Sequence, residues 1–278
     1  MAVLSPRVER VHPVELHNGP ALAGGAGSAQ RPGVLMVHVV EVSVALTPPQ
    51  PQPALERWLR PHEQQGWRER LDPADRQRSR TGRALLRALA AQVTGDDPAS
   101  IEFVTRCPVC GDDGHGRPRV AGNHTLFTSV AHAGDLVLAA VAGVPIGVDV
   151  ERFVTCDFDG FDDVALTVRE RAVIADLPPS ERRAARTGIW VRKEALLKRH
   201  EVGLSIDPRG VELGLDDHDR VVADPLAPDD RLALVGVAVA AGYRAALAVA
   251  ADVLPTVTML DSRQLWAAPA ARSRRSSD

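Results

Sequence analysis

The amino-acid sequence predicts an α+β fold. Several short segments are β-branched and alternate apolar with polar residues, which is the pattern of half-buried strands. Two longer segments repeat apolar residues every three or four positions, as amphipathic helices do. The chain of 278 residues is 45% hydrophobic and 25% charged. It can therefore bury a sizeable core, as one large domain or two smaller ones.

The N-terminal region combines a weakly patterned extension with a strand. Residues 1–32 carry scattered Gly, Ala and Pro with little periodicity, and we expect them to be poorly ordered. Residues 34–46 alternate and are β-branched, which predicts a strand. The run of prolines that follows Thr47 ends this strand.

Two helical segments come next. Residues 54–70 have a helical pattern, and Asp72-Pro73 begins a stronger helix that extends to about residue 93. Its buried side is predicted to hold Leu85, Leu86, Leu89 and Val93. Four arginines line one face of this helix because they are spaced by four, three and four residues: Arg76, Arg80, Arg83 and Arg87. Such a stripe is more often solvated than functional.

A Gly-rich loop at residues 106–118 follows a predicted strand at residues 101–105. The spacing of Cys107, Cys110 and His115 in this loop suggests zinc. A structural zinc site needs four ligands in a closed geometry, and no second close pair exists because Cys156 stands alone. The sequence leaves zinc binding open.

The remaining elements are read in the same way. Strands are predicted at residues 125–130, 136–144, 146–151, 211–215, 231–239 and 243–250. Thr167 and Glu170 form a capping-box pattern at a helix start, and a long helix is predicted over residues 180–199. Residues 267–278 are small and polar, and we expect a disordered tail.

Charged residues on two of these elements suggest chemistry. The period of two in the strand at residues 146–151 puts Asp149 and Glu151 on one face. Trp190, Glu194 and Lys198 recur every four residues, which puts them on one face of the long helix. Each motif alone is usually a solvated strand face or an exposed ion pair. Together they offer three carboxylates and an ammonium, which suit magnesium-assisted chemistry at a diphosphate.

The motifs together resemble the phosphopantetheinyl transferase superfamily, in its longer pseudo-dimeric branch that serves polyketide and nonribosomal peptide synthetases. Gly147-Val-Asp-Val-Glu151 is followed some forty residues later by Trp190-Val-Arg-Lys-Glu194-Ala-Leu-Leu-Lys198. Further motifs in the family's order are Gly116-Arg117-Pro118, Val130-Ala131-His132-Ala133-Gly134-Asp135, Gly203-Leu204-Ser205 and Gly242-Tyr243-Arg244. The resemblance extends over roughly residues 72–250.

The resemblance implies two similar α/β subdomains in a pseudo-twofold arrangement, with the active site in the cleft between them. The division would fall between residues 33–150 and residues 151–266. Because two fused halves would supply the cleft, a monomer is expected.

The resemblance also implies roles for individual residues. Asp149, Glu151 and Glu194 would hold Mg²⁺, or alternatively Mn²⁺, and Lys198 would stabilise the leaving phosphate. Coenzyme A would be bound by Asp149 and Lys198 together with Arg70 (or Arg68) at the 3′-phosphate, Gly116, Arg117 and Pro118 at the adenine nucleotide, and His132 at a phosphate. Ala131 stands where the family usually has a serine. This departure removes one hydroxyl donor and leaves phosphate binding more dependent on His132.

The function expected from this resemblance is transfer of the phosphopantetheine arm of coenzyme A to a serine of an acyl or peptidyl carrier protein. Glu194, directly or through a water, would take the proton of that serine. A metal-dependent hydrolase of a nucleotide diphosphate would use the same ligands without a carrier protein. A module that only binds coenzyme A is the third alternative, and the intact set of Asp149, Glu151, Glu194 and Lys198 argues against it.

Composition narrows the remaining function classes. Thirty-three basic and 36 acidic residues give a net charge of −3, whereas a nucleic-acid-binding protein would usually be more basic. No uncharged apolar run approaches the roughly 18 residues of a membrane span, and no signal peptide is recognisable. Three cysteines are too few for a disulfide framework. We therefore expect a cytoplasmic protein that binds neither membranes nor nucleic acid.

Overall fold

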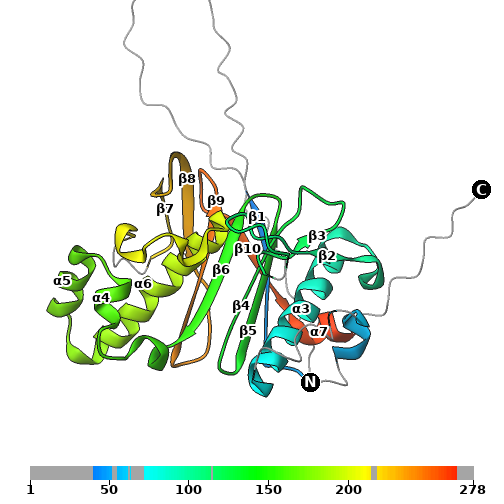
Figure 1. Ribbon diagram of the computed structural model, residues 1–278, viewed down its shortest axis with the longest axis horizontal. Coiled ribbons are helices and arrows are strands. Elements are labelled where there is room, and N and C mark those ends of the chain that lie inside the picture. Colours follow the sequence, from blue (N-terminus) through cyan, green and yellow to red (C-terminus); the bar gives the residue numbers. More distant parts are fainter. Residues whose placement is uncertain are drawn as a thin grey trace, which may run out of the picture. The chain divides into compact units, whose positions relative to one another are not determined.

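The computed structural model describes residues 40–51, 55–61, 63, 72–113, 115–213 and 218–267. The predicted N-terminal extension, Arg68, Arg70 and almost all of the predicted tail lie outside these residues. Within them the fold is mixed α/β, built on two four-stranded sheets and one two-stranded sheet (Figure 1). The α+β prediction is therefore confirmed at the level of a mixed α/β fold.

The first sheet has the strand order β10-β1-β5-β4. Its strands are β10 (Thr256–Asp261), β1 (Glu41–Thr47), β5 (Leu136–Ala142) and β4 (Phe127–Ala133). β1 pairs in parallel with β10 and antiparallel with β5, and β4 pairs antiparallel with β5. Helix α3 (Pro73–Thr94) packs its buried leucines against one face of this sheet, and α7 (Ser262–Ala267) adds Leu265 to the same core.

The second sheet has the strand order β6-β9-β8-β7, and all of its pairs are antiparallel. Its strands are β6 (Ile146–Arg152), β9 (Tyr243–Ala250), β8 (Ala227–Gly236) and β7 (Arg220–Asp224). Helix α6 (Pro179–His200) packs Val191, Ala195 and Leu196 against this sheet. Helices α4 (Phe161–Ala165) and α5 (Val168–Asp176) lie between β6 and α6 in the chain, and α5 begins with the capping box of Thr167 and Glu170 that the sequence predicts.

Short elements complete the described chain. The two-stranded sheet pairs β2 (Phe103–Val104) with β3 (Arg119–Val120). Five 3-10 helices are η1 (Glu56–Trp58), η2 (Pro98–Ser100), η3 (Phe153–Cys156), η4 (Gly203–Ser205) and η5 (Pro208–Gly210).

The two larger sheets repeat one topology. In the first, strand β1 is followed by the long helix α3 and by the hairpin of β4 and β5. In the sheet, β5 lies between β1 and β4. In the second, β6 is followed by α6 and by the hairpin of β8 and β9, and β9 lies in the middle. Both long helices have 22 residues and begin with a proline. One supersecondary unit therefore occurs twice in the chain.

The two sheets share a core on the faces that the long helices do not cover. This core contains Val42 of β1, Leu138 of β5, Val148 of β6 and Leu247 of β9. At the seam between the sheets, the backbone N–H of Val148 donates to Oγ of Ser129 at 3.0 Å. The long helices thus lie on the two outer sides of a pair of packed sheets (Figure 1).

The division predicted at residues 150/151 stays a prediction, and the strand pairing does not follow the order of the two halves in the sequence. β6 precedes residue 151 for most of its length, yet it pairs with β9 in the second sheet. β10 and α7 belong in sequence to the second half, yet β10 pairs with β1 of the first sheet. Near its C-terminal end the chain returns to the first sheet, where β10 pairs with the edge of β1 opposite β5.

Several predicted elements also need correction. The described part of residues 34–46 is strand only from Glu41. The predicted helix at residues 54–70 stays a prediction, because most of it lies outside the described residues, which include η1 and helical positions at Leu55, Pro61 and Glu63. Residues 211–213 are not a strand, because Val211 and Leu213 fill the core under α6 without pairing. The side of α3 predicted to be buried excludes Val93, which is 44% exposed in the last turn of the helix. β7, β10 and α7 were not predicted.

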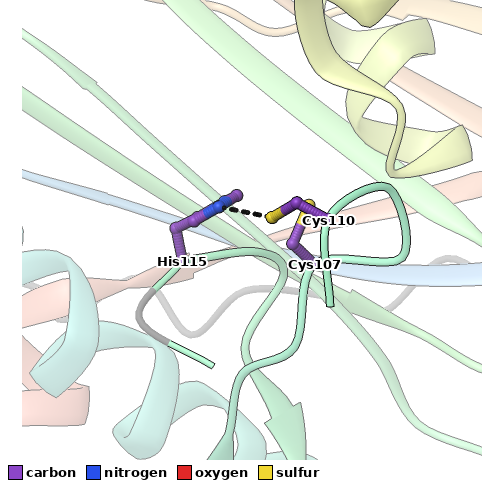
Figure 2. A group of neighbouring side chains, drawn as sticks. All are labelled: Cys107, Cys110 and His115. Atoms are coloured by element: carbon purple, nitrogen blue, oxygen red, sulfur yellow. Dashed lines mark hydrogen bonds between the residues drawn. The ribbon is translucent and has the colours of Figure 1, made fainter. Parts of the chain in front are cut away.

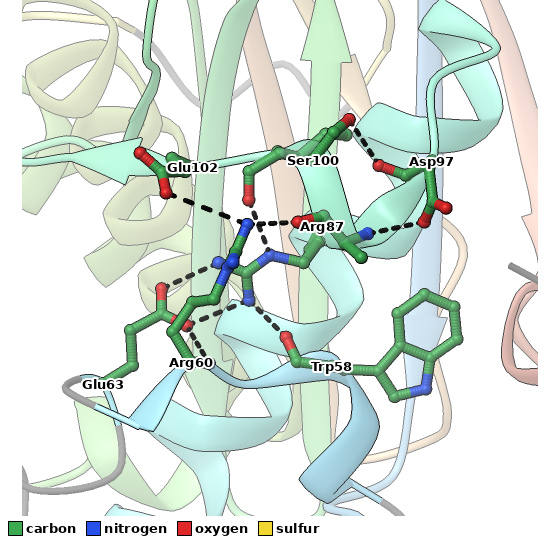
Figure 3. A network of polar contacts seen from close by, with 9 residues as sticks. Trp58, Arg60, Glu63, Arg87, Asp97, Ser100 and Glu102 are labelled. Carbon is green, nitrogen blue, oxygen red and sulfur yellow. Dashed lines mark hydrogen bonds and ion pairs between the residues drawn. The ribbon is translucent and has the colours of Figure 1, made fainter. Parts of the chain in front are cut away.

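Arg87 is buried rather than solvated, which corrects the interpretation of the arginine stripe. It is 2% exposed, and its guanidinium forms two hydrogen bonds with the carboxylate of Glu63, at 3.0 and 2.9 Å. It also donates to the carbonyl oxygens of Trp58 and Ile101, so its charge and N–H groups are largely satisfied (Figure 3). Arg60 closes the network by donating its backbone N–H to Glu63. Arg87 therefore joins Glu63 to α3 and is not available to a ligand.

Gly147 lets α6 approach β6 more closely than any side chain would allow. A Cβ atom at this position would lie 1.9 Å from the carbonyl oxygen of Ala195 and 2.5 Å from the backbone nitrogen of Arg199. Both are backbone atoms, which cannot rotate away. The glycine therefore sets the distance between the strand and the helix that carry the charged motifs.

We predict that Gly147→Ala lowers the free energy of unfolding by about 3 kcal/mol or more, since overpacking usually costs roughly 1–3 kcal/mol even where side chains can adjust. Gly143→Ala is the matched control, because no atom lies within 4 Å of its Cβ position. It should change stability by less than about 0.5 kcal/mol. Urea unfolding measures both, and equal effects would contradict the close approach.

Candidate functional site

Four charged residues of the predicted motifs line one cavity of about 430 Å³. Asp149 and Glu151 come from β6, and Glu194 and Lys198 from α6. The lining also includes Trp190 of α6, Ala131 and His132 of β4, Pro118, and Ser79, Gly82 and Arg83 of α3. Both predicted periodicities are confirmed, since each brings its residues to the same cavity.

Asp149 is the most buried of the four. Its side chain is 5% exposed, and its Oδ1 accepts a hydrogen bond from Nζ of Lys198 at 2.5 Å. Lys198 is 32% exposed and reaches the cavity. The second oxygen of Asp149, Oδ2, is buried and has no hydrogen-bond partner. An unsatisfied buried carboxylate oxygen is costly.

The electrostatics of the cluster favour an additional positive charge. Burial, together with the nearby charge of Asp149, raises the pKa of Glu151 to about 7. Burial raises the pKa of Glu194 as well, with a further contribution from Asp149. Burial would lower the pKa of Lys198, but the carboxylates outweigh it and the pKa is raised. Lys198 is therefore charged at neutral pH, and its single positive charge does not balance the negative charges of three ionised carboxylates.

These residues fit a divalent cation by their chemistry. With all four groups ionised, the cluster holds three negative charges against one positive charge, and its donors are hard carboxylate oxygens of the kind that Mg²⁺ and Mn²⁺ prefer. The unpartnered Oδ2 of Asp149 offers a free acceptor. The three carboxylates, however, do not all bring an oxygen within 4.8 Å of one another. Among the described residues, only Cys107, Cys110 and His115 place three ligand atoms that close together. The ligand set of Asp149, Glu151 and Glu194 stays a prediction.

His132 lies in the same cavity but differs from the expectation in its partners. Its Nε2 is 3.4 Å from Oγ of Ser79 on α3. Burial lowers the pKa of His132, and the positive charges of Arg78 and Lys198 lower it further. The ring is therefore neutral near pH 7. The neighbouring Ala131 belongs to the core between the sheets. The hydroxyl that contacts His132 is that of Ser79, a residue that the sequence analysis did not single out.

Gly116, Arg117 and Pro118 line a second cavity of about 640 Å³. The two cavities adjoin, since Pro118, Val130 and Lys198 line both. Arg117 does not offer a free charge to this space. Its Nη2 donates to the carbonyl oxygens of Lys198 and Arg199 at 2.6 and 2.7 Å, and its Nη1 is 3.4 Å from the carboxylate of Glu201. Arg117 thus caps the C-terminal end of α6.

Arg83 is a further basic residue of the first cavity that the sequence placed in the arginine stripe without assigning it a role. Its guanidinium lies 5.0 Å from the ring centroid of Phe103 and 3.7 Å from Glu63. Its Nη1 is buried without a hydrogen-bond partner. Arg70, the predicted contact to the 3′-phosphate, lies outside the described residues.

None of the described helices is long and apolar enough to cross a membrane.

Strand β6 and helix α6, which present three acids and one lysine to a cavity, lie in a part of the chain that is similar to a known family. Residues 145–248 match the family model of the 4′-phosphopantetheinyl transferase superfamily. This segment contains Asp149, Glu151, Glu194 and Lys198. The chain is similar to that superfamily over this segment.

Two curated relatives are similar to the chain. A 4′-phosphopantetheinyl transferase of Bacillus subtilis is 29% identical over 149 residues, which cover 52% of this chain and 62% of the relative. The 4′-phosphopantetheinyl transferase psf-1 of Bacillus pumilus is 28% identical over 138 residues, which cover 47% of this chain and 53% of the relative. The matched region thus spans between one half and two thirds of each relative.

We predict that Glu151→Gln stabilises the fold at alkaline pH. The pKa of Glu151 is raised from 4.5 to about 7, so between these values the folded state binds more protons than the unfolded state, and stability falls as the pH rises. Glutamine carries no charge, so the variant should gain on the order of 1–3 kcal/mol at about pH 8 and much less at about pH 5.

Urea unfolding at both pH values measures this difference. Glu41→Gln, at an exposed position of β1, is the control for removing a carboxylate. A gain of equal size at the two pH values would contradict a charge strained by burial.

Proposed function

We propose that the chain transfers the phosphopantetheine arm of coenzyme A to a serine of an acyl or peptidyl carrier protein and releases adenosine 3′,5′-bisphosphate. The observation that carries the proposal is the convergence of Asp149, Glu151, Glu194 and Lys198 on one cavity within the segment that matches the superfamily. The names of both relatives support transfer.

The two adjoining cavities suggest how coenzyme A would bind. Lys198 lines both, so the diphosphate would lie beside its ammonium. The nucleotide would occupy the larger cavity beside Gly116 and Pro118. His132, with Ser79 beside it, and the unpartnered Nη1 of Arg83 are the donors available to phosphate oxygens in the smaller cavity.

Each charged residue would then have a distinct role. Glu194 would take the proton of the carrier serine, and its raised pKa brings it closer to the neutral range that suits a general base. Lys198 stays charged and would offset the negative charge that grows on the leaving bisphosphate. Asp149 holds Lys198 in place through the 2.5 Å hydrogen bond. Mg²⁺ or Mn²⁺ bound by Asp149, Glu151 and Glu194 would polarise the diphosphate.

The wider setting belongs to the same proposal. We propose that the two strand-helix-hairpin units are related by a pseudo-twofold axis, because they share strand order and helix length. A single chain would then supply both walls of the site and act as a monomer. The three free cysteines agree with a reducing cytoplasm, and carrier proteins of polyketide or nonribosomal peptide synthesis would be the partners.

The first test incubates the protein with coenzyme A, Mg²⁺ and an apo-carrier protein and measures the intact mass of the carrier. We expect the mass of one phosphopantetheine arm to be added, and Asp149→Asn to reduce the rate by at least about 10²-fold, since it removes a charge that acts in the transition state. Asp163→Asn, on the exposed side of α4, is the control. Hydrolysed coenzyme A beside an unmodified carrier would identify a hydrolase, and binding without either product would identify a binding module.

Lys198→Ala should lower kcat by roughly 10²–10³-fold and change KM for coenzyme A much less, because charge on the leaving group is larger in the transition state than in the ground state. Lys198→Arg, which keeps the charge, should retain more of kcat than the alanine variant. Steady-state kinetics distinguish these cases. A rise in KM alone would show that Lys198 only binds the substrate.

A further inference from the structure

The loop between β2 and β3 brings together three metal-binding side chains. They lie outside the acidic cluster, which consists of Asp149, Glu151 and Glu194. Cys107, Cys110 and His115 each offer one ligand atom, and the three atoms lie within 4.8 Å of one another. Sγ of Cys110 is 3.1 Å from Nε2 of His115, and the side chain of Cys107 lies beside them (Figure 2). The sequence left zinc open, and the fold now shows that the three side chains converge.

The local backbone fixes the sulfur of Cys107. The backbone N–H groups of Cys110 and Val109 donate to this sulfur. Cys107 is 8% exposed, whereas Cys110 and His115 are exposed. One side of the group is therefore fixed in the protein, and the other is open to an entering ion.

We propose that Cys107 Sγ, Cys110 Sγ and His115 Nε2 bind one zinc ion, with a water molecule as the fourth ligand. Two thiolates are soft donors and an imidazole is a borderline donor, and this set favours zinc over the hard ions suited to the carboxylates of β6 and α6. Zinc–sulfur and zinc–nitrogen bonds of about 2.3 and 2.0–2.1 Å at a tetrahedral angle separate the two ligand atoms by about 3.6 Å. The present separation of 3.1 Å needs only a small widening.

Hydrogen bonds among the described residues also close the loop. Cys107 N–H donates to the carbonyl of Asp112 at 2.9 Å, Gly111 N–H to the carbonyl of Cys107 at 2.8 Å, and Oγ1 of Thr105 to the carbonyl of Asp113 at 2.6 Å. The strands at the base of the loop have two residues each. An ion bound by Cys107 and His115 would add a further constraint.

The position of the loop would put the ion at the wall of the 640 Å³ cavity. The chain crosses itself at Gly116, whose Cβ position would lie 2.9 Å from the backbone of Arg106. His115 directly precedes this crossing, and Arg117 directly follows it and binds the carbonyls of Lys198 and Arg199. All three ligands line the 640 Å³ cavity together with Gly116–Pro118. Zinc would thus fix the wall of this cavity and, through Arg117, its junction with α6.

The test measures the zinc content of the purified full chain by elemental analysis. We expect one zinc per chain, loss of most of it in Cys110→Ser and His115→Ala, and retention in Cys156→Ala and His124→Ala. Cys156 is a buried cysteine in a separate core, and His124 is exposed outside the loop. Asp149→Asn should keep its zinc, because the acidic cluster is a different site, so the result does not depend on transferase activity.

Two further measurements keep the proposal falsifiable where a variant fails to fold. Cobalt exchanged into the wild type should give the sulfur-to-cobalt charge-transfer absorption of a thiolate site, and a thiol reagent should release zinc together with a fall in the melting temperature. Zinc at the same level in wild type and His115→Ala, no sulfur-to-cobalt absorption, or a Cys107–Cys110 disulfide in protein purified under reducing conditions would overturn the proposal.

Discussion

The candidate site depends on the close approach of α6 to β6 at Gly147. A glycine within a strand usually weakens it, because there is no side chain to pack. Here the missing Cβ allows the backbone of the helix at Ala195 and Arg199 to reach the strand. The approach brings Lys198 within hydrogen-bonding distance of Asp149. Four charged groups then share a partly buried space that neither element could form alone.

This arrangement places the charges of the site in opposition to the stability of the fold. Three acids and one lysine leave the cluster short of positive charge, and burial together with the charge of Asp149 raises the pKa of Glu151 to about 7. The buried oxygen of Asp149 without a partner is another. Natural proteins keep such features where function needs them, because strain and unsatisfied polar groups concentrate at functional sites. A cation and a diphosphate together would supply both the missing charge and the missing partners.

The sequence predicted the parts of the structure that local patterns determine. The faces of β6 and α6, the capping box at Thr167 and the start of α3 at Asp72 all follow from periodicity or from short-range hydrogen bonds, and all are present. The role of Arg87 could not be read from its spacing, since its burial depends on Glu63 and on carbonyls of distant segments. Arg117 matched a motif, yet its charge is engaged by the end of α6. The pairing of β10 with β1 joins segments that are far apart in the sequence, so no local pattern predicts it.

The most direct test of this account is anomalous diffraction from crystals of the protein grown with coenzyme A and Mn²⁺. The account predicts a manganese peak bonded to Oδ2 of Asp149, with a carboxylate of Glu151 or Glu194 and diphosphate oxygens around it. It would be contradicted if coenzyme A were bound in the two cavities with no manganese at Asp149, or if manganese were bound elsewhere while Asp149 Oδ2 stayed without a partner.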